Sequence, residues 1–312
     1  MDVSVVVCTY AMARYDSFVE AVESVRSQTY DRTEAVLVVD GNEAVYERAR
    51  RQFGDCEDVV VHCNDENRGV AASRTTGARL AGGDVVAFLD DDAVADDEWV
   101  ERLVEAYRTH DAVAVGGRID GEWLVERPWY LPTEFDWLVG VTYPGFADDG
   151  ERVRNTFGSN LSMRRAVFLD LGGFNPNFGP SGDTHVQADE PELGMRLYES
   201  RGERMVYAAD AVVAHKVFAS RTDPRWLLRR AHDQGYSKRV LEELPYHDGG
   251  AEGDYLRSLV FHRGPGRLAE AVSQRSLRSF AAFLLFWVYT AAVGVGYLRG
   301  WLADTSGKRS TT

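Results

Sequence analysis

The chain is poor in cysteine and in lysine. Its three cysteines are odd in number and show no C-x-x-C spacing, which argues against a disulfide framework and against a structural zinc site. We therefore expect a reducing compartment. The N-terminus, MDVSVVV, has no positive charge and too short an apolar run for a signal peptide, so we expect the body of the protein on the cytoplasmic side.

Positive charge is also scarce, and it is unevenly distributed. The 35 basic and 49 acidic residues give a net charge of −14, which opposes binding to nucleic-acid phosphates. Residues 1–256 carry 27 basic and 47 acidic groups, net −20, whereas residues 257–312 carry 8 and 2, net +6. Only three of the basic residues are lysines. This arginine-rich, aspartate-rich usage is similar to that of cytosolic proteins of extreme halophiles, and it predicts an acidic body with a basic tail.

No P-loop and no G-x-G-x-x-G motif follows the first apolar run, which argues against an ordinary ATPase or dehydrogenase. Short valine-rich runs instead alternate with amphipathic segments, a pattern typical of a parallel sheet covered by helices on both faces. Ser17 and Glu20 have the spacing of a capping box, which predicts the start of the first helix. We expect strands at 3–8, 34–39, 59–62 and 85–89, and further helices at 44–53, 70–80 and 97–107.

The second part of the chain is less regular. Residues 116–155 are rich in Pro, Trp, Tyr and acidic side chains, and the aromatic cluster between Trp123 and Tyr143 either stacks on a sugar or lipid or packs locally. Helices are expected over 160–174, 191–201 and 224–241, with strands over 205–207 and 212–215. These patterns suggest a nucleotide-binding α/β half at 1–115, a substrate-facing half at 116–245, and a basic tail at 246–312.

The tail contains one charge-free apolar run, residues 280–298, FAAFLLFWVYTAAVGVGYL. About 20 such residues are needed to cross a bilayer. Arg275, Arg278 and Arg299 flank the run, where arginine side chains can reach lipid headgroups. We expect this helix to span the membrane, to lie in the membrane interface, or to be buried, in that order of preference.

Polar residues follow three of the predicted strands directly. Thr9 and Tyr10 follow the first strand, Asp40 the second, and Asp90, Asp91 and Asp92 the fourth. Ligands of open parallel sheets bind beyond the carboxyl ends of the strands. Because adjacent carboxylates repel one another, the acidic triplet predicts a divalent cation such as Mg²⁺ or Mn²⁺, with a solvated acidic loop as the alternative.

Five segments in this order together resemble glycosyltransferase family 2. They are VSVVVCTY, VLVVDG, NRGVAASRTTGARLAGGDVVAFLDDD, GSNLSMRRAVFLDLGGF and ADEPELGMRL, and the similarity extends over about residues 3–240. The resemblance implies the GT-A fold, an α/β fold with a Rossmann-like, mostly parallel sheet flanked by helices, here followed by a C-terminal hydrophobic helix. It also implies an inverting transferase that uses a nucleotide-diphosphate sugar as donor.

The resemblance assigns roles to individual residues. Thr9, Tyr10 and Asp40 match the nucleobase pocket, in which Asp40 accepts a hydrogen bond from a base N–H. Arg74 matches an arginine near the diphosphate and the base. The D-x-D motif of the family corresponds to Asp90, Asp91 and Asp92, with Asp91 and Asp92 at the ribose and the metal ion and Asp90 in support. His215, at the end of a predicted strand, matches a histidine that some GT-A enzymes place near the metal.

The family's catalytic base stands in an E-D-x-E-L-like motif, which corresponds here to ADEPEL. The register aligns Glu190 with the usual catalytic aspartate, and Asp189 is the second candidate. The acidic pair also complements the start of a helix with Pro191 at an early position, which is the structural alternative.

The resemblance, the basic apolar tail and the halophile-like composition together predict a membrane enzyme. We expect transfer of one sugar to a lipid-linked, dolichol-phosphate-type oligosaccharide at the cytoplasmic face of the cell membrane, for protein N-glycosylation or surface (S-layer) glycan assembly. Partners would be the nucleotide sugar, the lipid-linked acceptor, the membrane and other enzymes of the same pathway. The alternatives are a non-catalytic scaffold or sugar-binding subunit and a processive polysaccharide synthase, although the latter's Q-x-x-R-W motif is absent.

Overall fold

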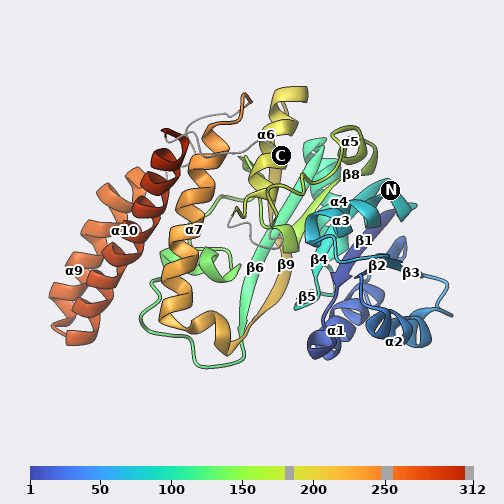
Figure 1. Ribbon diagram of the computed structural model, residues 1–312, viewed down its shortest axis with the longest axis horizontal. Helices are drawn as coiled ribbons and strands as arrows, with labels where there is room; N and C mark the ends of the chain where they lie inside the picture. Colours follow the sequence, from blue (N-terminus) through green and yellow to red (C-terminus); the bar gives the residue numbers. More distant parts are fainter. Residues whose placement is uncertain (180–185, 247–255, 306–312) are drawn as a thin grey trace. The chain divides into compact units, whose positions relative to one another are not determined.

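A computed structural model describes residues 1–179, 186–246 and 256–305 of the protein (Figure 1). The described residues form two compact units. The first unit contains those within Met1–Glu122, Gly145–Thr184 and Asp189–Lys216, and the second contains those within Trp123–Pro144, His185–Ala188 and Val217–Thr312. The sheet and its covering helices belong to the first unit, whereas the second is mainly helical.

Four parallel strands form one half of the sheet, in the order β3-β2-β1-β4. They are β1 (Val3–Thr9), β2 (Thr33–Asp40), β3 (Val59–Asn64) and β4 (Val85–Asp90). β1, β2 and β4 are valine-rich and buried on both faces, as strands covered by helices on both sides must be. The predicted strands are confirmed, and their parallel register brings Thr9, Asp40 and Asp90 to one edge of the sheet.

The helices that cover this half are α1 (Tyr15–Arg26), α2 (Glu43–Phe53), α3 (Val70–Leu80) and α4 (Trp99–His110). The predicted capping box is wrong. The 3₁₀ turn η1 (Met12–Arg14) leads directly into α1, so the helix begins at Tyr15 without a side-chain cap. Ser17 and Glu20 therefore lie within the helix, where both bond to Lys216.

The other half of the sheet is antiparallel and continues the order as β8-β6-β9-β5, with β7 beside β9. Its strands are β5 (Ala93–Ala95), β6 (Ala114–Trp123), β7 (Arg152–Val153), β8 (Leu161–Arg164) and β9 (Met205–Val217). β9 is continuous where two shorter strands were predicted. The helix predicted over 160–174 is also wrong, because its first part is β8 and only α5 (Arg165–Asp170) is helical.

The location of β8 explains that error. β8 lies between β4 and β6, and it pairs Leu161 with Phe88 and Met163 with Val86. Leu161 and Met163 are completely buried at this location between β4 and β6. Sheet pairing of this kind overrides a helical pattern read from local sequence.

Two apolar cores hold the first unit together. One contains Phe18 from α1, Phe53 from α2 and Trp99 from α4, packed with the valines of the parallel strands. The other contains Phe88, Phe168 and residues of α3 and of α6 (Asp189–Arg201). Helices cover both faces of the sheet, so polar side chains gather instead at the carboxyl ends of the strands.

The second unit is built from helices. Its main elements are the 3₁₀ segment η2 (Thr133–Val139) and the helices α7 (Pro224–Glu242), α9 (Gly264–Gln274) and α10 (Leu277–Thr305). Phe135 of η2 packs with Leu227 of α7 and with Phe286 and Tyr289 of α10. The aromatic segment thus contributes to a local core, and the predicted helices over 224–241 and 280–298 are confirmed within longer ones.

Candidate active site

The candidate site begins at the carboxyl ends of β1 and β4. Cys8 pairs with Asp90, so the acidic triplet 90–92 starts beside Thr9. The short strand β5 follows the triplet and pairs with β9, and this pairing sets Ala93 opposite His215. His215 therefore lies beside the acidic triplet, although it is more than a hundred residues away in the sequence.

Asp90, Asp92 and His215 form a potential metal site. One ligand atom from each residue lies within 4.8 Å of the others. His215 Nε2 is 3.3 Å from Asp92 Oδ1, and both side chains are almost completely buried. Two carboxylates and one imidazole suit a divalent cation, and the burial of Asp92 makes its uncompensated negative charge costly.

Asp91 points to different partners. Thr9 Oγ1 donates a hydrogen bond of 2.7 Å to Asp91 Oδ2, and Arg14 Nη2 lies 3.3 Å from Asp91 Oδ1. Arg14 also donates to Asp92 Oδ2 at 2.8 Å. Burial raises the pKa of Asp91 to about 6, although Arg14 opposes the rise. Asp91 is thus engaged by Thr9 and Arg14, outside the group formed by Asp90, Asp92 and His215.

Arg74 connects the acidic triplet with the acidic pair of α6. Its side chain is only 6% exposed, and Nη2 donates a 2.6 Å hydrogen bond to Asp90 Oδ1. Nη1 lies 3.5 Å from Asp189 Oδ2 and 3.8 Å from Glu190 Oε1. One buried guanidinium therefore holds three carboxylates from two distant parts of the sequence in a single network.

The two acids of α6 differ in their environment. The Asp189 side chain is 5% exposed, whereas that of Glu190 is 23% exposed. Burial, followed by the neighbouring Glu190, raises the pKa of Asp189 well above its ordinary value. Glu190 Oε1 accepts a 3.0 Å hydrogen bond from the Gly158 amide. A Cβ atom at Gly158 would lie only 2.4 Å from that oxygen, so a larger residue here would displace the Glu190 carboxylate.

Asp40 lies at the end of β2 in a network of its own. Its Oδ1 accepts hydrogen bonds from Asn64 Nδ2 and the Arg68 amide, and its Oδ2 accepts one from the Gly69 amide. Gly69 has a φ of 83°, a left-handed conformation that favours glycine. Tyr10, by contrast, is 51% exposed. Asp40 is fixed by these bonds, whereas the Tyr10 side chain remains accessible to a ligand.

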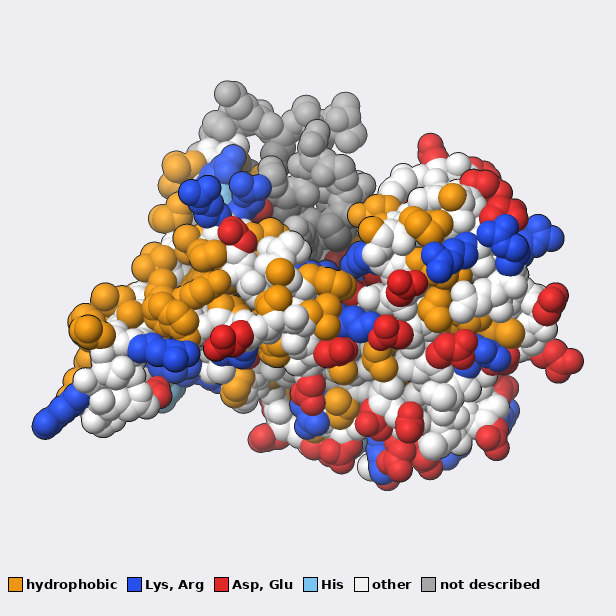
Figure 2. All heavy atoms as spheres, turned by 90° about the horizontal axis from the view of Figure 1, so that it is seen from below, with side chains coloured by type: hydrophobic (Ala, Val, Ile, Leu, Met, Phe, Trp, Pro, Cys, Tyr) orange, Lys and Arg blue, Asp and Glu red, His pale blue; other side chains and the backbone are white. Residues whose placement is uncertain are grey.

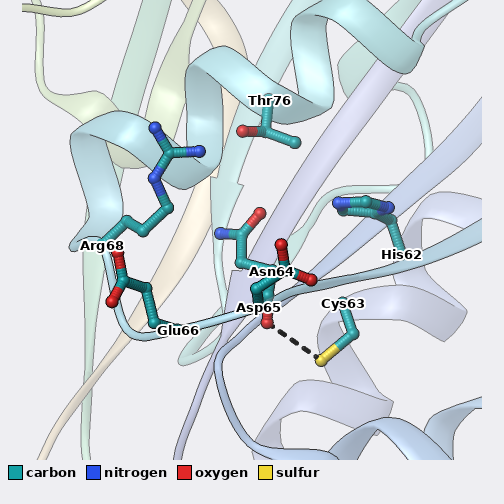
Figure 3. Close-up of a pocket in the computed structure, with 7 residues that line it drawn as sticks. All are labelled: His62, Cys63, Asn64, Asp65, Glu66, Arg68 and Thr76. Carbon is teal, nitrogen blue, oxygen red and sulfur yellow. Dashed lines mark hydrogen bonds between the residues drawn. The ribbon is translucent and has the colours of Figure 1, made fainter.

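A polar pocket of about 260 Å³ lies beside this network, at the end of β3 and the start of α3 (Figure 3). Two of its residues, Asn64 and Arg68, are among those that bond to Asp40. Its lining consists of His62, Cys63, Asn64, Asp65, Glu66, Arg68 and Thr76.

Comparison with known proteins identifies the family. A sequence model of glycosyl transferase family 2 matches residues 4–172, more than half of the chain. The chain belongs to glycosyl transferase family 2. It is 50% identical, over 97% of both chains, to the "Glucosyl-dolichyl phosphate glucuronosyltransferase" of Haloferax volcanii. It is also 30% identical to "Glycosyltransferase AglE" of the same organism, over 62% of this chain and 63% of that one.

Solved structures of other proteins share the fold of this glycosyltransferase. S. aureus TarS 1-349 in complex with UDP matches 100% of this chain and 93% of its own, with a TM-score of 0.55 and 15% identity. The mannosyltransferase PcManGT of Pyrobaculum calidifontis, in complex with GDP-Man and Mn²⁺, matches 99% and 88%, with a TM-score of 0.57 and 20% identity. The predicted GT-A-like α/β fold is confirmed.

The structure brings most of the predicted site residues of this glycosyltransferase together. Hydrogen bonds, ion pairs and the potential metal group join Thr9, Arg74, Asp90, Asp91, Asp92, Asp189, Glu190 and His215. Asp40 connects to this network less directly, since Asn64 donates both to Asp40 and to Ser73, the neighbour of Arg74.

Sequence reasoning missed two participants, Arg14 and Asn64. Arg14 is an isolated basic residue on a short 3₁₀ turn, and no motif indicates that it bonds to the acidic triplet. Asn64 ends β3 beside Asp40, so its location at a strand end was a usable signal.

Proposed function

We propose that this glycosyltransferase moves one glucuronosyl residue from a nucleotide-diphosphate sugar to a glucosyl-dolichyl-phosphate-type acceptor. The observation that carries the proposal is the 50% identity, over nearly the full length of both chains, to a protein of that printed name. The setting we infer is the cytoplasmic face of the cell membrane, in assembly of an N-linked or surface glycan together with other enzymes of the same pathway.

The donor nucleotide would bind at the ends of β1 and β2. An ionised carboxylate has about four acceptor sites, and the bonds from Asn64, Arg68 and Gly69 occupy three of those on Asp40. The remaining site can accept an N–H group of the base. Tyr10, half exposed after β1, can pack against the base or ribose.

A divalent cation, Mg²⁺ or Mn²⁺, fits the group formed by Asp90, Asp92 and His215. When bound there, it would stabilise the negative charge that develops on the departing diphosphate. Arg14 and Arg74 already neutralise part of the charge on Asp92 and Asp90. The chain's own cations and the metal would thus act on the same carboxylates.

The reaction requires removal of one proton from the acceptor hydroxyl. The hydroxyl oxygen bonds to the anomeric carbon as the bond from that carbon to the diphosphate oxygen breaks, and the nucleoside diphosphate leaves. Glu190 is the base we infer, since it is the more exposed acid and the Gly158 amide orients its carboxylate. A single base acting opposite the leaving group corresponds to inversion at the anomeric carbon.

The test is release of nucleoside diphosphate by the full chain from a panel of nucleotide sugars, with Mg²⁺ or Mn²⁺ and a dolichyl-phosphate-linked glucose acceptor. We expect release from a nucleotide-linked glucuronic acid, and we expect chelation of the metal to abolish it. Asp92→Ala should reduce the rate by about 100-fold or more, because it removes a metal-binding carboxylate.

Asp16→Ala is the matched control, since its side chain is 94% exposed on α1 and lies outside the network. It should keep the wild-type rate. Wild-type release in the presence of chelator, or equal rates for Asp92→Ala and the control, would refute metal-dependent transfer at this site.

A further inference from the structure

The described part of the second unit presents a long apolar surface on α10 and α9. Exposed large hydrophobic side chains of α10 recur at intervals of three, four or seven residues along one side of the helix. They are Leu277, Phe280, Leu284, Val288, Val295, Leu298 and Leu302, with exposed fractions from 44% to 90%. We call these seven residues the α10 stripe. Figure 2 shows hydrophobic side chains gathered over this part of the molecule.

The opposite side of α10 packs closely against α7, which runs beside it (Figure 1). A Cβ atom at Gly296 would lie 1.8 Å from the carbonyl oxygen of His232, and one at Gly235 would lie 1.9 Å from that of Val293. A Cβ atom at Gly300 would instead meet side-chain atoms of Arg239. The two helices are therefore in backbone contact around Val293 and Gly296, near the end of the apolar run.

α10 has the length and composition to cross a membrane, in its segment Leu277–Ala303. α7, however, would then lie at the same depth. Its nineteen residues include eight Arg, Lys, His, Asp or Glu side chains: Arg225, Arg229, Arg230, His232, Asp233, Lys238, Arg239 and Glu242. Charged groups in the hydrocarbon layer are costly, so a helix in backbone contact with α7 is a poor membrane span.

We propose that α10 lies in the plane of the membrane surface, with the α10 stripe inserted among the lipids and α7 on the aqueous side. Helices that bind in this way have one apolar side and cationic residues at the level of the headgroups. Arg275, Arg278 and Arg299 are exposed at the two ends of the stripe, and residues 257–312 carry a net charge of +6 in a chain of net −14. The partner is the surface of an anionic phospholipid bilayer.

The neighbouring helix α9 extends the same surface. Leu268 and Val272, one helical turn apart, are 44% and 67% exposed. Arg267, on another side of α9, forms an ion pair with Glu134 and so attaches the helix to η2.

A second copy of the chain is a less suitable partner for the α10 stripe than a lipid surface. Pairing the stripes of two copies would bring their arginines together, and like charges repel one another.

Measuring the depth of spin labels in the bilayer distinguishes an α10 that lies in the plane of the membrane from one that spans it. Single cysteines at Leu284, Val288, Val295 and Leu298, in a full chain with its three native cysteines replaced, would be labelled and bound to vesicles of phosphatidylglycerol and phosphatidylcholine. Collision with oxygen and with a water-soluble nickel chelate reports depth. We expect all four labels at one shallow depth, whereas a spanning helix would separate the first and last by about 20 Å at 1.5 Å per residue.

Each remaining outcome contradicts the proposal. Labels that reach a mid-bilayer maximum would show a spanning helix. Labels that are open to the nickel chelate would show a stripe in water, and labels that are shielded from both reagents and broadened by one another would show a second copy. A label at Asp16, which is 94% exposed on α1, provides the aqueous reference.

A second measurement does not require cysteine replacement. The triple variant Leu284→Gln, Val295→Gln and Leu298→Gln should bind the same vesicles at least roughly tenfold more weakly, because it removes apolar area from the lipid. Val60→Gln with Leu80→Gln, two exposed apolar residues of the first unit, should bind within about twofold of wild type. Equal binding by both variants would overturn the role of the stripe.

Discussion

At the scale of single residues, the central question is how two adjacent acids acquire different chemistry. Asp189 and Glu190 share Arg74, yet burial raises the pKa of Asp189 and favours its protonated form. Glu190 is more exposed and accepts a hydrogen bond from the Gly158 amide. A general base must be accessible to the acceptor and ionised when it arrives, and Glu190 meets the first condition better.

We therefore expect Glu190→Gln to lower kcat for sugar transfer by about 100-fold to 10,000-fold, the usual contribution of a general base. Donor affinity should change little, because the side-chain carbonyl oxygen of the substituted glutamine can still accept the hydrogen bond from Gly158. Asp189→Asn should lower kcat by less than about tenfold. Steady-state kinetics of transfer and calorimetry of nucleotide binding would measure both quantities.

Glu199→Gln is the control for these variants, since Glu199 is an exposed acid on the same helix. It should match wild type in both measurements. The assignment fails if Asp189→Asn loses as much activity as Glu190→Gln, or if Glu190→Gln retains more than half of the wild-type kcat.

At the scale of elements, much of the first half of the chain could be predicted from the sequence. The strands of the parallel half are continuous valine-rich runs, and α3 shows its pattern in residues 70–80. A continuous apolar run is a sufficient signal for β1, β2 and β4, because helices bury these strands on both faces. The acidic triplet was found for a related reason, since charge directly after a buried strand is unusual.

The antiparallel half could not be predicted in the same way. β8 has an apolar pattern that also suits a helix, and only its insertion between β4 and β6 makes it a strand. The link between His215 and Asp92 depends on the pairing of β5 with β9, which joins residues far apart in the sequence. Local patterns carry no information about such partners, and Arg14 was missed for the same reason.

The packing of α7 against α10 gives a prediction at this scale. Gly296→Ala should destabilise the second unit by about 1–3 kcal/mol, since its new Cβ would overlap the carbonyl oxygen of His232 and force the helices apart. Gly294→Ala, two residues earlier on the same helix, meets no atom within 4 Å. It should be neutral or stabilising by up to about 1 kcal/mol, because alanine favours a helix.

Urea unfolding of the two variants and of wild type would test this difference, with the change in midpoint read at constant m-value. Equal stability of Gly296→Ala and Gly294→Ala would show that α7 and α10 do not pack in backbone contact. That result would also remove the charge argument against a membrane-spanning α10.

At the scale of the whole molecule, the two units provide complementary features. The first has an acidic network of strand-end carboxylates with Arg14 and Arg74 among them. The second carries an exposed apolar stripe with arginines at its ends. A soluble, charged donor and an acceptor with a long apolar chain require two such surfaces, and this combination agrees with the substrates that we infer from the 50% identical relative.

The most direct test of that account is the mass of the lipid product. The purified full chain would be incubated with nucleotide-linked glucuronic acid, Mn²⁺ and a glucosyl-dolichyl-phosphate-type lipid, and the lipid fraction analysed by mass spectrometry. The account predicts that the acceptor gains the mass of one hexuronosyl residue, and that Glu190→Gln forms almost none of this product. An acceptor that stays unmodified while the enzyme glycosylates a soluble acceptor, or gains a different sugar from another donor, would contradict the account.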